Sequence, residues 1–203
     1  MQDLIIEAIA AGGYLGVFAL MVLENLFPPI PSEVIMGIGG VLVARGDMAF
    51  WPLLIAGTLG TTLGNYAWYW IGDRWGYRRL KPFIDRHGRW LTLCFSDVEK
   101  AAKFFQNHGQ WIVFVMRFSP MLRTVISLPA GLSHMKTGRF LLFTTAGAGV
   151  WNALLIEGGR WLAPYMAKYE HVASWAIGGL IAAIVLFYLY RVATWKPGSD
   201  EPG

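Results

Sequence analysis

The chain has 203 residues, of which 55% are hydrophobic and 15% aromatic, with ten tryptophans. This composition argues against a soluble domain and predicts a single-domain, all-α polytopic membrane protein. The formal net charge of +4 would permit nucleic-acid binding, but basic residues beside so many apolar runs are expected to contact anionic lipid headgroups. The single cysteine, Cys94, excludes an internal disulfide and is a poor metal site.

The first part of the chain is predicted to hold an apolar helix followed by a broken segment. The helix covers residues 4–23, with its orientation left open, and the broken segment covers residues 24–44. Proline interrupts a helix because it lacks the N–H group and clashes with the preceding turn. The broken segment contains three prolines: Pro28, Pro29 and Pro31.

A short helix is predicted after these prolines. Ser32 is expected at its N-cap, with Glu33 in the first turn, where an acid interacts favourably with the helix dipole. The apolar run over residues 34–44 spans only about 16 Å at about 1.5 Å per residue, whereas the hydrocarbon core is about 30 Å thick. The segment is therefore predicted to be re-entrant, and it ends in a turn at Gly46 and Asp47.

Three full spans are predicted over residues 52–72, 139–160 and 172–190, and the first apolar helix would make a fourth. Glycines at small-residue spacing let a neighbouring backbone approach closely. The first of the three spans contains such glycines: Gly57, Gly60 and Gly64. Pro164 is expected to break the chain after the second span. One membrane domain thus covers residues 1–191.

A basic loop follows residue 72. Eight of the 17 lysines and arginines lie between Arg74 and Lys103, which predicts a cytoplasmic location by the positive-inside rule. Within this loop, residues 96–109 are expected to form an amphipathic helix on the cytoplasmic surface. Counting spans from this loop places the tail, residues 192–203, in the cytoplasm as well.

The second broken segment covers residues 111–131, with Pro120 and Pro129 inside it. Two similar stretches, IGDRW at 71–75 and EGGRW at 157–161, each end a span that follows a broken segment. These spans run in opposite directions, so the pattern predicts an inverted repeat whose two re-entrant segments face each other, as in transporters. The alternative is that the shared motif is only a convenient helix exit at the membrane interface.

Arg117 and Arg123 are the main candidates for substrate binding. Charges inside apolar sequence survive only where protein or water covers them. Arginine presents a planar fork of donors, so two arginines turned together by Pro120 can grip a phosphate. The alternative is that both side chains reach out to the membrane interface.

Glu24 and Glu33 are candidates for proton coupling. A carboxylate among apolar groups resists ionisation, whereas a nearby arginine favours it, so such a group can exchange a proton as a cavity opens. The alternatives are a structural arginine partner for Glu24 and a helix-terminal acid for Glu33. Sodium remains an alternative coupling ion. Further cavity-lining candidates are Asn65, Tyr66, Ser119 and Pro120, while Glu157 is expected to pair with Arg160.

An enzyme is not expected, although a lipid phosphatase would also use arginines and acids. The nearby hydroxyls have no histidine at motif spacing to activate them, and no metal-ligand cluster or cofactor motif is present in the sequence. These hydroxyls are Ser32, Ser119, Thr124 and Ser127. A scaffold for other membrane proteins is a further alternative, and a homodimer is left open.

Three blocks of the chain resemble the DedA family, also called the VTT or SNARE-associated family. They are residues 24–33, GTTLGNYAWYWIGDRWG at 60–76 and FVMRFSPMLRTVISLPAG at 114–131, and the resemblance covers roughly residues 14–161. It implies two facing re-entrant segments and a role in lipid transport. The family's functional residues fall here on Glu24, Glu33, Arg117 and Arg123.

The resemblance also implies a substrate and a location. Bacterial members are implicated in recycling undecaprenyl phosphate across the cytoplasmic (inner) membrane and in envelope homeostasis that depends on the proton motive force. Eukaryotic relatives resemble phospholipid scramblases. The expected function is therefore a flippase for a polyprenyl phosphate, and the alternative is a less selective transporter or scramblase of phospholipids such as phosphatidylethanolamine.

Overall fold

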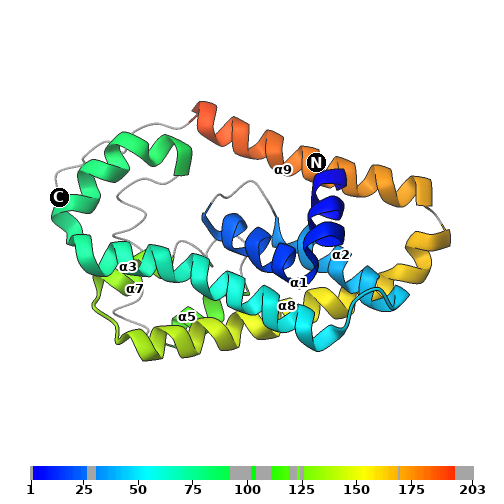
Figure 1. Ribbon diagram of the computed structural model, residues 1–203. Helices are drawn as coiled ribbons and strands as arrows, with labels where there is room; N and C mark the ends of the chain where they lie inside the picture. Colours follow the sequence, from blue (N-terminus) through cyan, green and yellow to red (C-terminus); the bar gives the residue numbers. More distant parts are fainter. Residues whose placement is uncertain are drawn as a thin grey trace. The chain divides into compact units, whose positions relative to one another are not determined.

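The computed structural model describes residues 2–26, 31–91, 102–103, 111–118, 123, 126–168 and 170–194. Within these ranges every regular element is a helix, which confirms the predicted all-α class for this part of the chain (Figure 1). The helices are α1 (Gln2–Leu26), α2 (Ser32–Arg45), α3 (Phe50–Leu91), α5 (Ile112–Met116), α7 (Ser127–Leu132), α8 (Thr137–Lys168) and α9 (Glu170–Thr194).

The chain divides into two compact units. Unit 1 comprises residues 1–64 and 145–185, and unit 2 comprises residues 65–144 and 186–203. Helices α3, α8 and α9 each contribute residues to both units. Unit 1 therefore contains the whole of α1 and α2, and unit 2 contains the whole of α5 and α7, each with parts of the long helices.

Helix α2 begins one residue earlier than predicted. Its N-cap is Pro31, with φ −79° and ψ 127°, and Ser32 is already the first helical residue. The predicted N-cap at Ser32 is therefore wrong, because extended backbone ends at the proline, whose missing N–H group costs no helical hydrogen bond at a cap. Glu33 lies in the first turn, and Gly46 ends the helix with φ 84°, as the turn there predicts.

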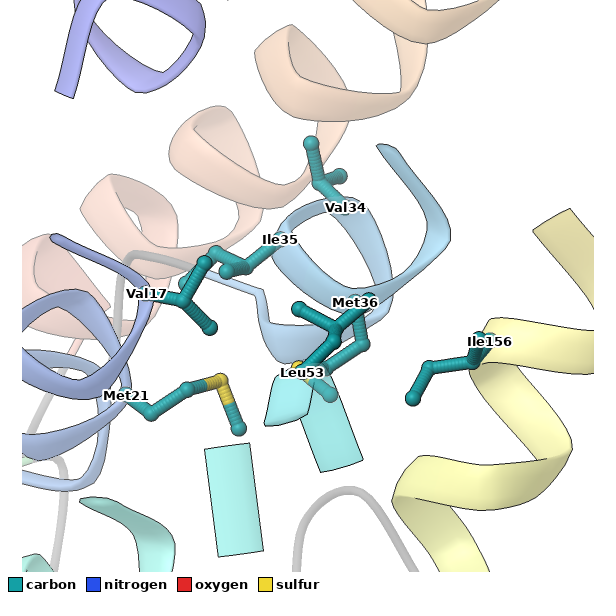
Figure 2. Packing of buried hydrophobic residues seen from close by; sticks show 7 residues of the cluster. All are labelled: Val17, Met21, Val34, Ile35, Met36, Leu53 and Ile156. Carbon is teal, nitrogen blue, oxygen red and sulfur yellow. The ribbon is translucent and has the colours of Figure 1, made fainter. Parts of the chain in front are cut away.

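Seven buried apolar side chains from four helices form the core of unit 1 (Figure 2). They are Val17, Met21, Val34, Ile35, Met36, Leu53 and Ile156. Figure 2 shows Val17 and Met21 of α1 pointing toward Leu53 of α3, whereas Val34 of α2 points away from Leu53. Three consecutive residues of α2 are buried here, which requires that neighbouring helices cover more than one side of α2.

Glycines bring α2 and α8 of unit 1 into backbone contact. A Cβ atom added at Gly40 would overlap the carbonyl oxygen of Ile156, and one added at Gly159 would overlap the carbonyl oxygen of Gly37. Larger residues at these two positions would force the helices apart. Gly40 and Gly159 therefore set the distance between α2 and α8.

The small-residue spacing predicted on the first span serves the same purpose. A Cβ atom added at Gly60 would lie 2.5 Å from the carbonyl oxygen of Phe18, and one added at Gly64 would lie 2.6 Å from the Cβ of Asn25. Both neighbours belong to α1. The predicted close approach of another backbone to this face of α3 is thus confirmed.

Unit 2 repeats this type of contact between α3 and α7. A Cβ atom added at Gly72 would overlap the carbonyl oxygen of Leu128, and one added at Gly131 would overlap the carbonyl oxygen of Tyr69. The ring of Tyr69 also stacks on Phe140 with centroids 4.3 Å apart, in a core of buried side chains. These contacts hold α7 and the start of α8 against α3.

The predicted start of the basic loop is wrong. The basic loop expected from Arg74 is helical up to Leu91, with a break at Gly76, where φ is 60°. Glycine tolerates that φ, and the arginines and leucines that follow it favour a helix. The amphipathic helix predicted over 96–109 lies outside the described residues, apart from residues 102–103, which are helical.

Helix α8 does not end at the predicted break. It contains Pro164 and continues to Lys168. The proline removes one backbone hydrogen bond, and this loss affects only the last turn of the helix. Among the described residues, one helical stretch is long and apolar enough to cross a membrane, namely Thr137–Tyr165 with a mean hydropathy of 1.4. It includes the span predicted over residues 139–160.

Candidate functional site

Arg117 follows α5 and is almost fully buried, with 2% of its surface exposed. Its Nη1 donates to Oδ1 of Asn65 over 2.5 Å and also to the backbone carbonyl of Arg123. Its Nη2 donates to Oγ of Ser127 over 3.1 Å and to Oγ1 of Thr144 over 2.9 Å. We call these four neutral acceptors, three side-chain oxygens and one carbonyl, the neutral cage.

Three helices of unit 2 position the cage. Asn65 and Gly72 are seven residues apart on α3, and therefore lie on one face about two turns apart. Ser127 and Gly131 are four residues apart on α7, so they also share a face. The contact between the two glycines thus brings Asn65 and Ser127 together, and Ser127 Oγ donates to Asn65 Oδ1 over 2.8 Å.

The electrostatics of this arrangement are unusual. Within the described part of the chain, Arg117 forms no ion pair, and its Nε makes no hydrogen bond. Its guanidinium carbon lies 5.8 Å from the ring centroid of Phe140, a cation–π contact that compensates part of the charge. Neutral acceptors offset only some of the cost of burying a charge, so an anion beside Arg117 would be strongly stabilised.

The other members of the predicted arginine site are only partly described. Arg123 is buried, with 6% of its surface exposed, and its backbone carbonyl belongs to the neutral cage. Ser119 and Pro120 lie outside the described residues. The role of Arg123 in binding a phosphate therefore remains a prediction.

The two acids belong to unit 1. Glu24 lies near the end of α1 with 4% of its surface exposed, and its Oε2 accepts a hydrogen bond from Nδ2 of Asn25 over 2.5 Å. Glu33 lies in the first turn of α2 and is half-buried. The predicted arrangement, with these acids facing Arg117 and Arg123 across one cavity, stays a prediction.

Two other predicted polar residues have clear surroundings. Tyr66 packs against the core of unit 2, and its ring stacks on that of Tyr69 with centroids 5.9 Å apart. Glu157 Oε1 accepts a hydrogen bond from Nη1 of Arg160 over 2.6 Å on the exposed side of α8. The expected structural pairing of Glu157 is thus confirmed.

Sequence reasoning missed two members of the cage. Ser127 was considered only as a hydroxyl for phosphatase chemistry, and Thr144 was not considered at all. Serine and threonine are common between membrane helices, where they hydrogen-bond across the interface, so neither residue type stands out in the sequence. The one available signal was the spacing of Ser127 from Gly131 in a proline-broken segment.

Residues 30–160 match the family model of the VTT domain. The chain belongs to the VTT domain family, also called the DedA family. The matched range contains Arg117, all members of the neutral cage and Glu33, whereas Glu24 precedes it. No solved structure matches the chain.

Several curated VTT domain relatives extend over most of the chain. Undecaprenyl phosphate transporter A of Staphylococcus aureus is 36% identical over 162 residues, which cover 80% of each chain. The Bacillus subtilis protein of the same name is 33% identical over 181 residues, covering 89% of this chain and 87% of its own. A Lactococcus lactis subsp. cremoris protein named alkaline phosphatase-like protein is 36% identical over 214 residues, covering 99% of this chain and 100% of its own.

Other VTT domain relatives, from Bacillus subtilis and Synechocystis, are named membrane proteins. Together with the apolar helix over Thr137–Tyr165, these names indicate that the chain is a membrane protein. Arg117 is then a buried cation in a membrane domain. Such a residue is expensive to keep there and usually marks a functional site.

Proposed function

We propose that this chain is a transporter that moves a polyprenyl phosphate, such as undecaprenyl phosphate, across the bacterial cytoplasmic membrane. The observation that carries the proposal is the buried guanidinium of Arg117, whose hydrogen-bond partners among the described residues are all neutral. A site with an uncompensated positive charge favours an anion, and a phosphate oxygen is a strong acceptor for guanidinium N–H groups. Two relatives named undecaprenyl phosphate transporter A support this choice of anion.

The phosphate headgroup and the lipid tail would be handled differently. Arg117 and Arg123 bind the phosphate in the interior of the protein, whereas the prenyl chain remains in the surrounding hydrocarbon. This division needs no large apolar pocket, because the membrane itself solvates the tail.

Release of the phosphate requires a change in the electrostatics of the site. Glu24 and Glu33 would supply it by loading and releasing protons, with the proton motive force as the driving force. Glu24 is a buried ionisable residue with 4% of its surface exposed, which supports its choice as a coupling group. Coupling to sodium through the same acids is the alternative.

Two further pairs of sequence segments share a pattern, which supports a transporter architecture built from two repeats. Residues 27–40 and 118–131 share the pattern F-x-P-x4-V-I-x4-G, and residues 58–72 and 145–159 share T-x-G-x4-N-x6-G. In this register Gly40 corresponds to Gly131, and Gly72 corresponds to Gly159.

These equivalent glycines make equivalent contacts. In unit 1 the short helix of the first repeat packs on the long helix of the second, through Gly40 and Gly159. In unit 2 the short helix of the second repeat packs on the long helix of the first, through Gly131 and Gly72. This exchange of partners supports an inverted repeat with two re-entrant segments. The multiple spans and the cytoplasmic C-terminus are proposed from the apolar runs and the basic segment of the sequence.

A phosphatase is the second candidate, because one relative is named alkaline phosphatase-like protein. In unit 2 the hydroxyl of Ser127 lies within hydrogen-bond distance of Arg117, as a phosphatase nucleophile would. Ser127 donates its proton to the amide oxygen of Asn65, which is not a base. An unactivated hydroxyl is a poor nucleophile, so the geometry favours binding without hydrolysis.

The proposal is tested by following labelled undecaprenyl phosphate in reconstituted liposomes, with and without a pH gradient. The wild type is expected to move the lipid faster with the gradient. Arg117→Ala and Arg123→Ala should each slow transport by about tenfold or more, because each removes charge-assisted hydrogen bonds to the phosphate. Arg45→Ala, which changes an exposed arginine at the end of α2, is the matched control and should leave the rate unchanged.

The other outcomes separate the alternatives. Transport that ignores both the gradient and the two arginines would indicate a scramblase. Release of inorganic phosphate would indicate the phosphatase. No movement of the lipid and no hydrolysis would contradict both and leave a scaffold. Glu24→Gln and Glu33→Gln should abolish the response to the gradient, since neither glutamine can carry a proton.

A further inference from the structure

The hydrogen bonds of Arg117 account for four of its five N–H groups. A guanidinium carries two N–H groups on each Nη and one on Nε. Nη1 donates to Asn65 and to the carbonyl of Arg123, and Nη2 donates to Ser127 and Thr144. Only the Nε–H group makes no hydrogen bond within the described residues. The guanidinium of Arg117 is therefore nearly saturated with neutral acceptors.

This saturation restricts how an anion can bind. A phosphate engages a guanidinium best through two parallel hydrogen bonds along one edge. The edge that contains the unoccupied Nε–H group also contains an N–H group of Nη2. A bidentate phosphate on this edge must therefore replace one of the Nη2 acceptors, either Ser127 or Thr144.

Replacing a hydroxyl acceptor by a phosphate oxygen is favourable, but the net gain is smaller than the strength of the new hydrogen bonds. Charge-assisted hydrogen bonds to a phosphate are about twice as strong as bonds to a neutral hydroxyl. The site gains the difference between the two, and not the full strength of the new bonds. A cage of this kind lowers the net affinity for the anion and gives the guanidinium partners to return to when the anion leaves.

We propose that the neutral cage is an exchangeable substitute for phosphate oxygens, in which Thr144 and Ser127 compete with the lipid phosphate for Arg117 and thereby speed its release. This inference rests on the proposed function and adds a mechanism of release to it. The competing groups are two hydroxyls contributed by α8 and α7. They tune affinity and turnover in opposite directions.

Removing the Thr144 hydroxyl should have a different effect from removing a residue that only stabilises the folded site. Thr144→Val keeps the shape of the side chain and removes the acceptor, so one Nη2–H group of the empty site loses its partner. The empty state is then less stable, whereas the phosphate-bound state loses little. Binding of the anion should become about tenfold tighter, and turnover at saturating lipid should become slower.

The test measures binding of farnesyl phosphate, a short prenyl phosphate, to the full-length protein in lipid nanodiscs, together with the rate of lipid transport. The variants are Thr144→Val and Ser127→Ala, with Thr144→Ser as the conservative variant that should restore wild-type behaviour. Thr145→Val is the matched control. It alters the next residue of α8, whose hydroxyl lies 3.2 Å from that of Thr62 in unit 1, and it should leave the affinity unchanged.

Tighter binding with slower turnover in Thr144→Val or in Ser127→Ala supports the exchange, because the phosphate replaces one of these two hydroxyls. Unchanged or weaker binding in both Thr144→Val and Ser127→Ala would overturn the exchange. This conclusion requires that both variants unfold at about the wild-type temperature and that Arg117→Ala still abolishes binding. If Arg117→Ala binds farnesyl phosphate as well as the wild type does, the proposed phosphate site itself is wrong and the exchange falls with it. Farnesol, which lacks the phosphate, shows whether the measured affinity depends on the headgroup.

Discussion

Arg117 shows what a single side chain demands from the protein interior. Its charge is buried, and the cage around it offers dipoles in place of a counter-ion. An acid in the cage would have stabilised the folded protein more, but it would also have neutralised the site before any anion arrived. In the proposed function, the use of neutral acceptors would thus keep the site attractive to a phosphate.

This argument predicts the effect of an isosteric change at Asn65. Asn65→Asp places a carboxylate beside Nη1 of Arg117, so the guanidinium acquires an internal counter-ion. We expect thermal unfolding at the same or a higher temperature and a loss of farnesyl phosphate binding of at least about tenfold, since the internal carboxylate replaces the anion. Thermal unfolding and binding in nanodiscs measure the two effects.

The corresponding asparagine of the other repeat is the control. Asn152 is 1% exposed and lies 3.5 Å from Oγ1 of Thr58, in a unit that does not contain Arg117. Asn152→Asp should lower the unfolding temperature, because it buries a carboxylate beside a hydroxyl. Undiminished phosphate binding in Asn65→Asp would contradict this account of the site.

At the scale of the elements, glycine contacts hold each short helix against a long one. In a membrane, lipid tails are as apolar as leucine side chains, so helices gain little from hiding apolar surface from water. Close packing and hydrogen bonds between helices must hold them instead. The two glycine contacts, α2 with α8 and α3 with α7, provide such packing in the two units.

Two adjacent glycines of α8 provide a direct test. A Cβ atom at Gly159 would overlap the carbonyl oxygen of Gly37, whereas a Cβ atom at Gly158 has no heavy atom within 4 Å. Gly159→Ala should destabilise the protein by about 1–3 kcal/mol through overpacking. Gly158→Ala should be neutral or stabilise it by up to about 1 kcal/mol, because alanine favours a helix.

Thermal unfolding in detergent micelles compares the two variants with the wild type. The difference between them matters more than either value, since both add the same methyl group one residue apart. Equal effects of the two changes would show that the backbone contact between α2 and α8 does not limit stability. Gly131→Ala offers the same comparison in unit 2, where a Cβ atom would overlap the carbonyl oxygen of Tyr69.

At the scale of the whole molecule, the charges of the chain predict its direction through the membrane. The lysines and arginines between Arg74 and Lys103 predict that this segment faces the cytoplasm. Cys94 lies within it and is the only cysteine of the chain, which makes it a natural reporter. Its position is outside the described residues, so the prediction depends on the sequence alone.

A membrane-impermeant maleimide is expected to label Cys94 only after cells are opened. In a Cys94→Ala background, Asp47→Cys should be labelled in intact cells, because the turn after α2 is expected on the opposite side of the membrane. Labelling of Cys94 in intact cells would reverse the proposed orientation. Labelling of both positions from one side would contradict the topology on which the inverted repeat depends.

Local features of the chain were readable from the sequence because they depend on neighbours along the chain. The turn at Gly46, the acid at the start of α2 and the pairing of Glu157 with Arg160 each involve residues within four positions of one another. Predictions were wrong where a rule for ending a helix was outweighed by neighbouring residues that favour a helix. The helical stretch after Gly76 and the helix that continues through Pro164 are examples.

The candidate site was predictable only in part. Proline-broken sequence with internal charges pointed to Arg117, and a polar residue in an apolar span pointed to Asn65. Its other partners, Ser127 and Thr144, are ordinary hydroxyl residues in sequence. They become part of the site because glycine contacts hold α3 and α7 together and because the core of unit 2 includes the start of α8. Charge and proline are visible in a sequence, whereas the acceptors that surround a buried charge depend on how distant helices pack.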